Sequence, residues 1–188
     1  MTRKVRGSLF VDYVRMIRSR KDVDWTALLQ AEDLPFLEQR TEPNSWYPME
    51  AFERMGNAIL RVVGGGDLQT VKTWGRLSVE QLQALHPELV AEGNPAESLF
   101  RLQVLRSSFF DFDALKFRDI RDYSVQIEID YGMGALAEEA ATHQALGVFE
   151  RILELSGATG VQGSILERSW AGDQHTLIEF TWTGPTAH

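Results

Sequence analysis

The sequence predicts an α+β fold in which an N-terminal multi-helix half packs on a C-terminal four-stranded antiparallel sheet. Two observations carry this prediction. Apolar residues recur every three or four positions up to about residue 110, which is the period of helices with one buried face. After Asp113 they alternate with polar residues instead, which is the period of strands with one face in water. Helices gathered in one half and strands in the other are typical of the α+β class.

The first part of the helical half is predicted to contain one longer helix and two short ones. Residues 8–21 place apolar side chains on one helical face and basic side chains, among them Arg15 and Arg18, on the rest. Asp24 is a good N-cap for a short helix before "WTALLQ", and another short helix is expected around "LPFLEQR". The stretch "TEPNSWYP" is rich in turn-forming residues and is expected to be a loop.

Three further helices are marked by their start and stop signals. Pro48 suits the first turn of a helix that ends at the glycines of residues 64–66. Asp67 can cap the next helix, inside which Gly75 costs about 1 kcal/mol of helix propensity relative to alanine and so indicates close helix packing. The third helix begins at Asn94, where "NPAE" forms a start that resembles a capping box.

The second half is predicted to follow the β-β-α-β-β order. "ALKFRDI" and "YSVQIEIDY" are expected to pair as antiparallel strands that turn near Arg121 and Asp122. A helix is expected from about Leu136 to Ser156, with Gly157 as its stop. "VQGSILERSW" and "HTLIEFTW" complete the sheet as a hairpin that turns at "AGDQ". The alternation in the second strand places five residues on one face: Tyr123, Val125, Ile127, Ile129 and Tyr131.

The chain is expected to form a single domain over residues 1–188. This length suffices for one substantial core, or for two small subdomains that share one. The change of apolar period divides the domain into a helical subdomain, residues 1–110, and a β-β-α-β-β subdomain, residues 111–188. No internal repeat of about 20 to 50 residues is visible, so a solenoid is not expected.

Composition limits the classes of partner and the compartment. A net charge of −8 and a pI near 5.0 work against nonspecific binding to nucleic acids and to anionic lipid surfaces. The chain has no cysteine, which excludes disulfides and thiolate metal sites and fits a reducing compartment. No apolar run approaches the roughly 18 residues that span a bilayer, and the N-terminus has no signal-peptide pattern. We therefore expect a cytoplasmic protein without nucleic-acid or membrane partners.

The side chains that usually carry catalysis or metal binding form no recognisable motif. The glycines before Asp67 lack the lysine and the upstream strand that a phosphate-binding loop needs. Glu138 and Glu139 lie near a helix N-terminus, where carboxylates favour the helix dipole without any catalytic role. We expect no enzymatic activity, no metal site and no cofactor. The histidines lack metal-site spacing and are expected to be ordinary surface, helix-end or strand residues: His86, His143, His175 and His188.

Aromatic side chains are concentrated in the helical half and at its exit. They offer enough apolar volume to line a pocket between the helices and the sheet. They would equally fill a core, which is favoured because close packing is the rule in protein interiors. If a pocket exists, we expect five residues to line it: Trp74, Leu105, Phe109, Phe112 and Tyr131.

The order of the elements and several short phrases resemble one superfamily. The phrases are "VRGSLF" at the first helix, "YPMEAFERMGNAI", "WGRLSVEQLQALHPEL" followed by "SLFRLQVL", and the ending with two strands, a helix and two strands. Over most of the chain they resemble the superfamily that contains the heme nitric-oxide/oxygen-binding (H-NOX) sensor domains and the 4-vinyl-reductase-like small-molecule-binding domains. Residues 147–182 also look like the terminal segment of the 4-vinyl-reductase-like branch, without the cysteines often found there.

The resemblance implies two heme-binding features, and this sequence departs from both. The position of the proximal histidine falls at or near Asp111, and residues 98–128 contain no histidine. The Tyr-x-Ser-x-Arg motif that holds the heme propionates matches only at Tyr131, since Met133 and Ala135 stand where serine and arginine would be. Aspartate is a poor ligand for heme iron, and the propionates would lose their charged clamp. The resemblance therefore implies the scaffold and argues against the cofactor, and the phenylalanines around Asp111 are interpreted as a hydrophobic closure of the site.

These observations lead to the hypothesis of a non-catalytic cytoplasmic sensor or protein-interaction domain on a heme-sensor-like scaffold without heme. It would bind a small apolar ligand between its helical and sheet halves, or an unidentified protein partner. Arg15 and Arg18 could present a docking face to such a partner. An exposed basic helix side with no specific role explains these two arginines equally well.

Three alternatives remain open. One is a heme-based gas or redox sensor with an unconventional iron ligand, His86 or His143. Another is an enzyme, which would need a nucleophile–base pair or a metal set that the sequence does not display. The third concerns assembly: a homodimer could form if strand edges near Ala114 or Trp182 paired with a second copy.

Overall fold

The computed structural model describes residues 2–184, which form two compact units. The first unit contains residues up to Asp67 together with Ser107–Phe112, and the second contains Leu68–Arg106 together with the chain from Asp113 onward. The expected boundary at residue 110 differs from this division, because the helices within residues 68–106 group with the sheet. His188 lies outside the described residues.

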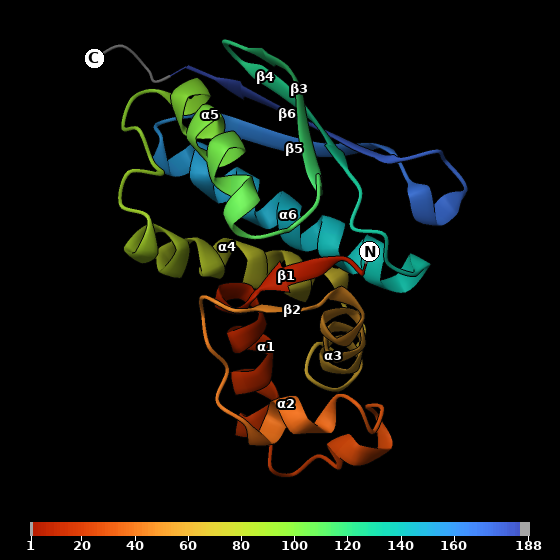
Figure 1. The fold of residues 1–188 in the computed structure, drawn as a ribbon. Helices are drawn as coiled ribbons and strands as arrows, with labels where there is room; N and C mark the ends of the chain where they lie inside the picture. The colour runs from red at the N-terminus through yellow and green to blue at the C-terminus, as the bar shows by residue number, and fades with distance from the viewer. Residues whose placement is uncertain (1, 185–188) are drawn as a thin grey trace. The chain divides into compact units, whose positions relative to one another are not determined.

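The described part of the first unit holds three helices, a 3-10 helix and a two-stranded ribbon (Figure 1). The helices and the cap at Asp24 confirm the sequence prediction, since the Asp24 side chain accepts the N–H of Thr26 at 3.1 Å. The loop predicted for residues 41–48 is partly wrong, because its last three residues pair antiparallel with residues 4–6. The elements are β1 (Lys4–Arg6), α1 (Gly7–Ser19), η1 (Trp25–Ala27), α2 (Leu34–Glu38), β2 (Trp46–Pro48) and α3 (Met49–Val62).

Aromatic rings fill the core of the first unit. Phe10 stacks on Tyr47 with the ring centres 4.5 Å apart, and Phe36 meets both rings edge-on. Tyr13 of α1 stacks on Phe52 of α3 at 4.3 Å. Burial raises the pKa of Tyr13 to about 12, so its hydroxyl stays protonated at physiological pH. The apolar stripes that predicted these helices therefore meet each other.

A buried ion pair attaches the residue before α2 to helix α3. Asp33 is completely buried, and Arg54 donates to its two carboxylate oxygens from Nε at 2.8 Å and from a terminal nitrogen at 2.7 Å. The backbone N–H of Gln30 donates to the same carboxylate at 3.2 Å. A buried carboxylate without its cation is costly, so this corner of the first unit depends on Arg54.

The second unit combines three helices and a 3-10 helix with a four-stranded antiparallel sheet. The strands lie in the order β3-β4-β6-β5, which confirms the predicted β-β-α-β-β arrangement. Asn94 caps its helix as predicted, by accepting the N–H of Glu97 at 3.1 Å. Among the described helices of the chain, none has the length and apolar character needed to cross a membrane. The elements are α4 (Leu68–Leu85), α5 (Pro95–Leu105), β3 (Leu115–Arg121), β4 (Ser124–Ile129), α6 (Ala135–Leu155), β5 (Thr159–Glu167), η3 (Ser169–Ala171) and β6 (Thr176–Thr183).

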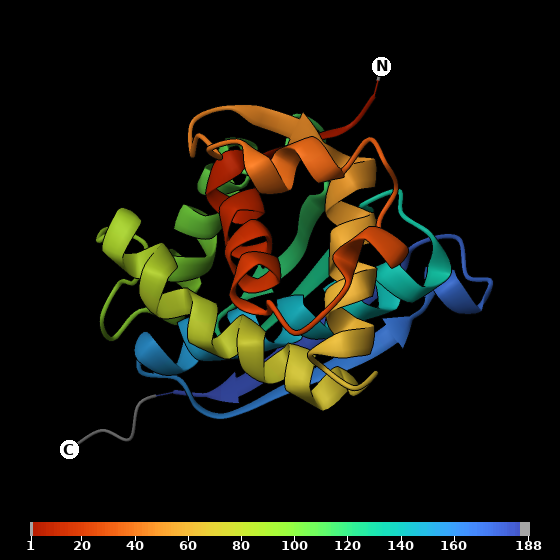
Figure 2. The same ribbon diagram turned by 90° about the horizontal axis from the view of Figure 1, so that it is seen from below.

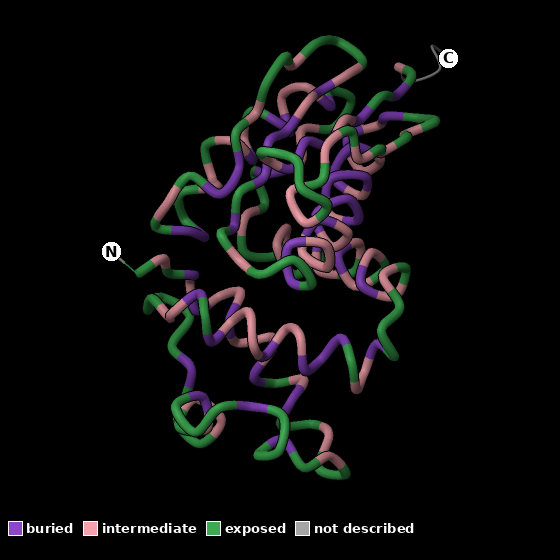
Figure 3. Tube along the Cα trace, turned by 90° about the vertical axis from the view of Figure 1, so that its right-hand side faces the viewer, coloured by how far each residue is buried: buried purple, intermediate pink, exposed green. Residues whose placement is uncertain are grey.

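Helix α6 covers the apolar face of this sheet. Val125 of β4 pairs with Phe180 of β6, Ile127 pairs with Ile178, and all four are completely buried. Phe149 of α6 lies against Phe180, with ring centres 5.6 Å apart. In Figure 3 the buried stretches of this unit run along α6 and the central strands. The core of the second unit therefore lies between α6 and the sheet.

Two expectations about the strands are wrong. Tyr123 is predicted on the apolar face, but it is 56% exposed because it lies in the turn between β3 and β4. Trp182 is predicted near a sheet edge, but its strand β6 pairs with both β4 and β5 and is therefore interior. The hairpin of β5 and β6 is confirmed, and the connection that contains "AGDQ" also includes η3. The edges of the sheet are β3 and β5, and Ala114 just before β3 is buried. Homodimerisation stays a prediction.

Helices α4 and α6 touch through their backbones and lie side by side in Figures 1 and 2. A Cβ at Gly75 would lie 2.1 Å from the carbonyl oxygen of Gln144, and one at Gly147 would lie 2.0 Å from that of Lys72. Only glycine leaves room for such an approach, so the close packing expected at Gly75 is confirmed. Ion pairs flank the contact: Lys72–Glu150 at 2.7 Å and Arg76–Glu154 at 2.6 Å.

We expect Gly147→Ala to lower the free energy of unfolding by about 3 kcal/mol, because the new methyl group would overlap the carbonyl of Lys72 and push the helices apart. Urea unfolding measures the change. Ala141→Gly, at a half-buried position of the same helix, is the matched control and should cost only about 1 kcal/mol of helix propensity. A Gly147→Ala protein as stable as the wild type would contradict the backbone contact.

We expect Arg54→Met to lower the free energy of unfolding by about 3 kcal/mol, because Asp33 would keep a buried charge without its cation. Thermal and urea unfolding at neutral pH measure the loss. Arg61→Met, at an exposed position of the same helix, should change the free energy by less than about 0.5 kcal/mol. Equal losses in the two variants would show that the ion pair contributes nothing specific.

Candidate ligand pocket

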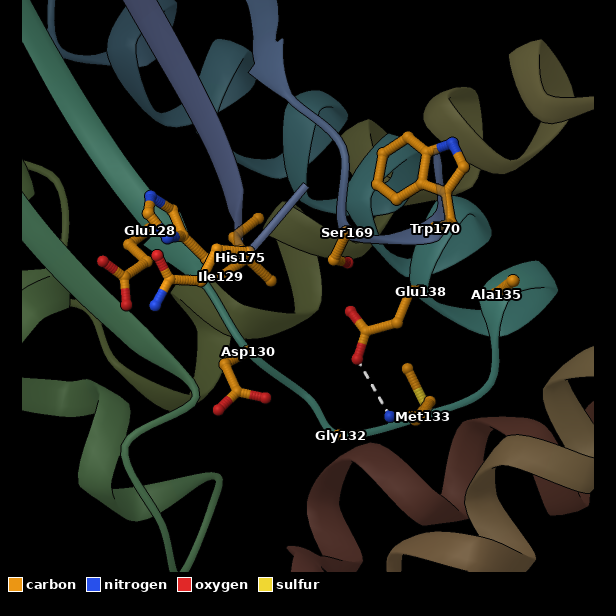
Figure 4. Close-up of a pocket in the computed structure, with 11 residues that line it drawn as sticks. Glu128, Ile129, Asp130, Gly132, Met133, Ala135, Glu138, Ser169, Trp170 and His175 are labelled. Carbon is orange, nitrogen blue, oxygen red and sulfur yellow. Dashed lines mark hydrogen bonds between the residues drawn. The ribbon is translucent and has the colours of Figure 1, made fainter. Parts of the chain in front are cut away.

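The second unit contains a pocket where β4 ends and α6 begins (Figure 4). Its volume is about 430 Å³, within the range of small-molecule sites in proteins. Gly132 has a φ of 69°, the left-handed conformation that glycine adopts without strain, and it lies in the turn that leads into α6. The walls come from the end of β4, this turn, the first residues of α6, and the segment from η3 to the start of β6.

Glu138, in the first turns of α6, is one of two buried carboxylates that line the pocket, and Glu128 of β4 is the other. Glu138 is 6% exposed, and its Oε1 accepts the backbone N–H of Met133 at 2.9 Å. Its Oε2 is buried, and no donor among the described residues forms a hydrogen bond with it. Burial raises the pKa of Glu138 above its ordinary value, although the backbone N–H groups of Met133, Gly132 and Tyr131 lower it. The side chain therefore holds one oxygen in place and leaves the other in need of a donor.

The other charged side chains of the pocket come from β4, from the turn after it and from the start of β6. Burial alone would raise the pKa of Glu128, but Lys116 at 3.1 Å and the adjacent Arg118 bring it below its ordinary value. His175 pairs with Glu167 at 2.9 Å through its Nε2. The turn after β4 adds the exposed carboxylate of Asp130, whose negative charge raises the pKa of Glu138 further.

The electrostatic character of the pocket is acidic. Of the residues described along its walls, three carry carboxylates and none is lysine or arginine. Nowhere within residues 2–184 do three histidine, aspartate or glutamate side chains gather in a group that could hold a metal ion. The pocket is therefore suited to a ligand that carries hydrogen-bond donors or positive charge.

Sequence reasoning placed Glu138 near a helix N-terminus, where the structure has it, and assigned it no role beyond the helix dipole, so its burial was not predicted. A signal for its burial exists in the sequence. Glu138 precedes Thr142 and Leu146 by four and eight residues, so it belongs to the stripe of α6 that turns inward. A carboxylate on such a stripe marks either an ion pair or a polar site.

The five residues predicted to line a pocket are divided between the two units. Trp74, Leu105 and Tyr131 belong to the second unit, whereas Phe109 and Phe112 belong to the first. Tyr131 and Phe109 are 8% exposed and the other three are half-buried. None of the five lines the pocket at the start of α6. A pocket formed by these five residues together stays a prediction.

The two arginines predicted to dock a partner have neighbours within the first unit. Arg18 donates to the carbonyl oxygens of Leu37 at 2.7 Å and Gln39 at 2.5 Å, and so caps the C-terminal end of α2. Arg15 lies 3.7 Å from Asp12, one turn earlier on α1, and its side chain is 72% exposed. Their role in docking stays a prediction.

Asp111 lies in a segment that extends the ribbon of the first unit. Its backbone N–H donates to the carbonyl of Lys4 at 3.2 Å, and its Oδ1 accepts the N–H of Lys4 at 2.7 Å. The preceding residue, Phe110, is buried and forms a bridge with Val5 of β1. Asp111 itself is exposed, and its carboxylate accepts the backbone N–H of Lys4.

The histidines within the described residues lie in the second unit. His86 follows α4 and lies 3.6 Å from Glu88. His143 lies in α6, where burial lowers its pKa and its Nδ1 makes no hydrogen bond with any described residue. His175 is paired to Glu167. None of these three histidines lies in the segment of the first unit that contains Asp111.

Comparison with known proteins identifies the fold. No protein-family model and no curated sequence matches the chain. Solved structures do: the Fe(II) unliganded H-NOX protein from K. algicida has a TM-score of 0.67 and 10% identity, covering 97% of this chain and 99% of its own. The chain has the H-NOX fold. A single-residue mutant of T. tengcongensis H-NOX has a TM-score of 0.60 and 12% identity, covering 97% of this chain and all of its own. An oxygen-binding H-NOX domain related to soluble guanylate cyclases has a TM-score of 0.62 and 11% identity, covering 97% of both chains.

Another matching H-NOX structure concerns heme distortion. The residues of the present chain can therefore be compared with what a heme would need. The carboxylate of Asp111 already accepts the backbone N–H of Lys4, and aspartate is a poor ligand for heme iron. Met133 and Ala135 offer neither a charge nor a side-chain donor to a propionate. The N–H of Met133 already binds Glu138, whose carboxylate would repel a propionate. The residues do not fit heme at the positions that the resemblance indicates.

We expect Glu138→Gln to raise the melting temperature at pH 7. Burial raises the pKa of Glu138, so the folded protein holds this proton more tightly than the unfolded chain, and stability falls as pH rises above the ordinary carboxyl pKa. Glutamine keeps the acceptor for Met133 and carries no charge. The gain should vanish below about pH 4, where the wild-type carboxyl is protonated in both states. Melting curves across this pH range measure the difference, with Glu139→Gln as the control. A Glu138→Gln protein less stable at pH 7 would contradict the burial cost.

Proposed function

We propose that this chain is a non-catalytic sensor domain that binds a small molecule in the pocket at the start of α6, on an H-NOX fold that does not use heme. One observation supports the proposal above all others. Where the resemblance places the residues that hold the heme propionates, this chain has Met133 and Ala135 beside the buried carboxylate of Glu138. The site that would attract negatively charged groups in a heme protein is negatively charged here.

The H-NOX fold supports a sensor role. One structure of this fold is an oxygen-binding domain related to soluble guanylate cyclases, so the scaffold can hold a small ligand. A ligand-binding domain of this kind needs a site for its ligand and no catalytic group. The polar lining favours a ligand with at least one polar group over the wholly apolar ligand expected from the sequence.

A second candidate function, a heme-based sensor with an unconventional iron ligand, is favoured by one observation. The Nδ1 of His143 is buried without a hydrogen bond among the described residues, and the lowered pKa keeps the ring in the neutral form that binds metals. His86 is the other candidate ligand. A protein partner, a homodimer and the cytoplasmic location also remain predictions from the sequence.

Titration of the purified chain with hemin separates the two candidates. We expect the broad absorbance of unbound hemin and an unchanged melting temperature, because neither unit offers the ligand and clamp that the resemblance requires. The K. algicida H-NOX protein serves as the positive control. A saturable Soret band that is lost in His143→Ala or His86→Ala would overturn the proposal and establish the second candidate.

A further inference from the structure

We infer that the pocket at the start of α6 binds a small primary alkylamine in its protonated form, with Glu138 as the group that receives the ammonium. The inference rests on the proposed small-molecule role and names its ligand class. It is carried by an unsatisfied buried oxygen, by the sign of the charge around it, and by the apolar surface beside it. Each can be followed in Figure 4.

The unsatisfied oxygen is Oε2 of Glu138. A buried acceptor without a donor carries a desolvation cost that a bound N–H group removes. Oε1 already accepts the N–H of Met133, so the carboxylate is held at one oxygen and presents the other. In Figure 4 the carboxylate points into the space between Asp130, Ser169 and Met133. Met133 has a flexible unbranched side chain, so a ligand can displace it at little cost.

The charge around this oxygen selects a cation. Asp130 adds a second negative charge to the pocket, and its repulsion of the Glu138 carboxylate is relieved by an ammonium placed between the two. The described lining contributes no lysine or arginine that could take that place. A bound anion would meet the carboxylates of Glu138 and Asp130. Lys116 and Arg118 are engaged by the third carboxylate, Glu128, so anionic ligands are disfavoured.

The cation is organic rather than a metal ion. No three carboxylate or imidazole groups of the described chain converge as a metal ion would need. Met133 and Trp170 line the same cavity and bring apolar side chains that a hydrocarbon chain could contact. A primary ammonium supplies three N–H donors, and one of them would donate a charge-assisted hydrogen bond to Oε2 of Glu138.

The test uses n-butylammonium chloride as the probe and n-butanol as its uncharged counterpart, with the ¹⁵N-labelled chain of residues 1–188. We expect saturable shifts of the backbone resonances of Met133 and Glu138 with the ammonium and none with the alcohol. Glu138→Gln should weaken binding about tenfold or more, because the charged acceptor is lost. Glu139→Gln, the adjacent carboxylate outside the pocket lining, should leave the affinity within about twofold, as expected for a surface charge.

Asp130→Asn is a second variant that changes an exposed side chain, and it should weaken binding by a smaller factor than Glu138→Gln. It keeps the inference testable if Glu138→Gln does not fold. Absence of saturable shifts with butylammonium, or binding that neither variant weakens, would overturn the inference. If neutral or anionic molecules then shift the same resonances, the small-molecule role stands and the assignment of an alkylamine as the ligand is wrong. If only hemin binds, the proposed function itself is wrong.

Discussion

The backbone contact between α4 and α6 is the constraint on which the second unit depends. Gly75 and Gly147 bring the helices together on one side of α6, and Phe149 meets the sheet on another. Close-packed surfaces on two sides leave the helix little freedom to rotate about its axis. Glu138 lies nine residues before Gly147, about 13 Å along that axis, so the glycine contact also sets where its carboxylate points.

The turn between β4 and α6 carries different side chains here from those that the resemblance implies. The resemblance to heme sensors implies a polar and cationic clamp in this turn, and the present chain has an acidic pocket beside it. In the backbone of the turn, Gly132 takes the left-handed conformation and the N–H of Met133 donates to the side chain of Glu138. Specificity can therefore change through a few side chains while the scaffold stays the same.

Sequence reasoning succeeded where the signal is local. Asp24 and Asn94 cap their helices through neighbours two and three residues away, and the period of apolar residues predicted the helices and the four strands of the sheet. It failed where the deciding contact is distant. The bond between Lys4 and Asp111 joins residues 107 positions apart, and strands of three residues are too short to show an alternation.

Burial was the other source of error. Glu138 was given only a role in the helix dipole because it lies near a helix N-terminus, although its spacing to Leu146 placed it on the inward stripe. Arg18 lies on the basic helix side considered for docking, and the structure adds a contact that the sequence did not show, since Arg18 caps the end of α2.

Residues 107–112 belong to the first unit, although they follow two helices of the second. They pair with β1 through the bonds of Lys4 and Arg6 to Asp111 and Phe109. During synthesis, therefore, the first unit cannot complete its hydrogen bonding until residue 112 has left the ribosome, by which time α4 and α5 have also emerged. The hydrogen bonds of β1 to Phe109 and Asp111 can therefore form only after the residues of α4 and α5 have been made, which ties the completion of the first unit to a segment that comes later in the chain.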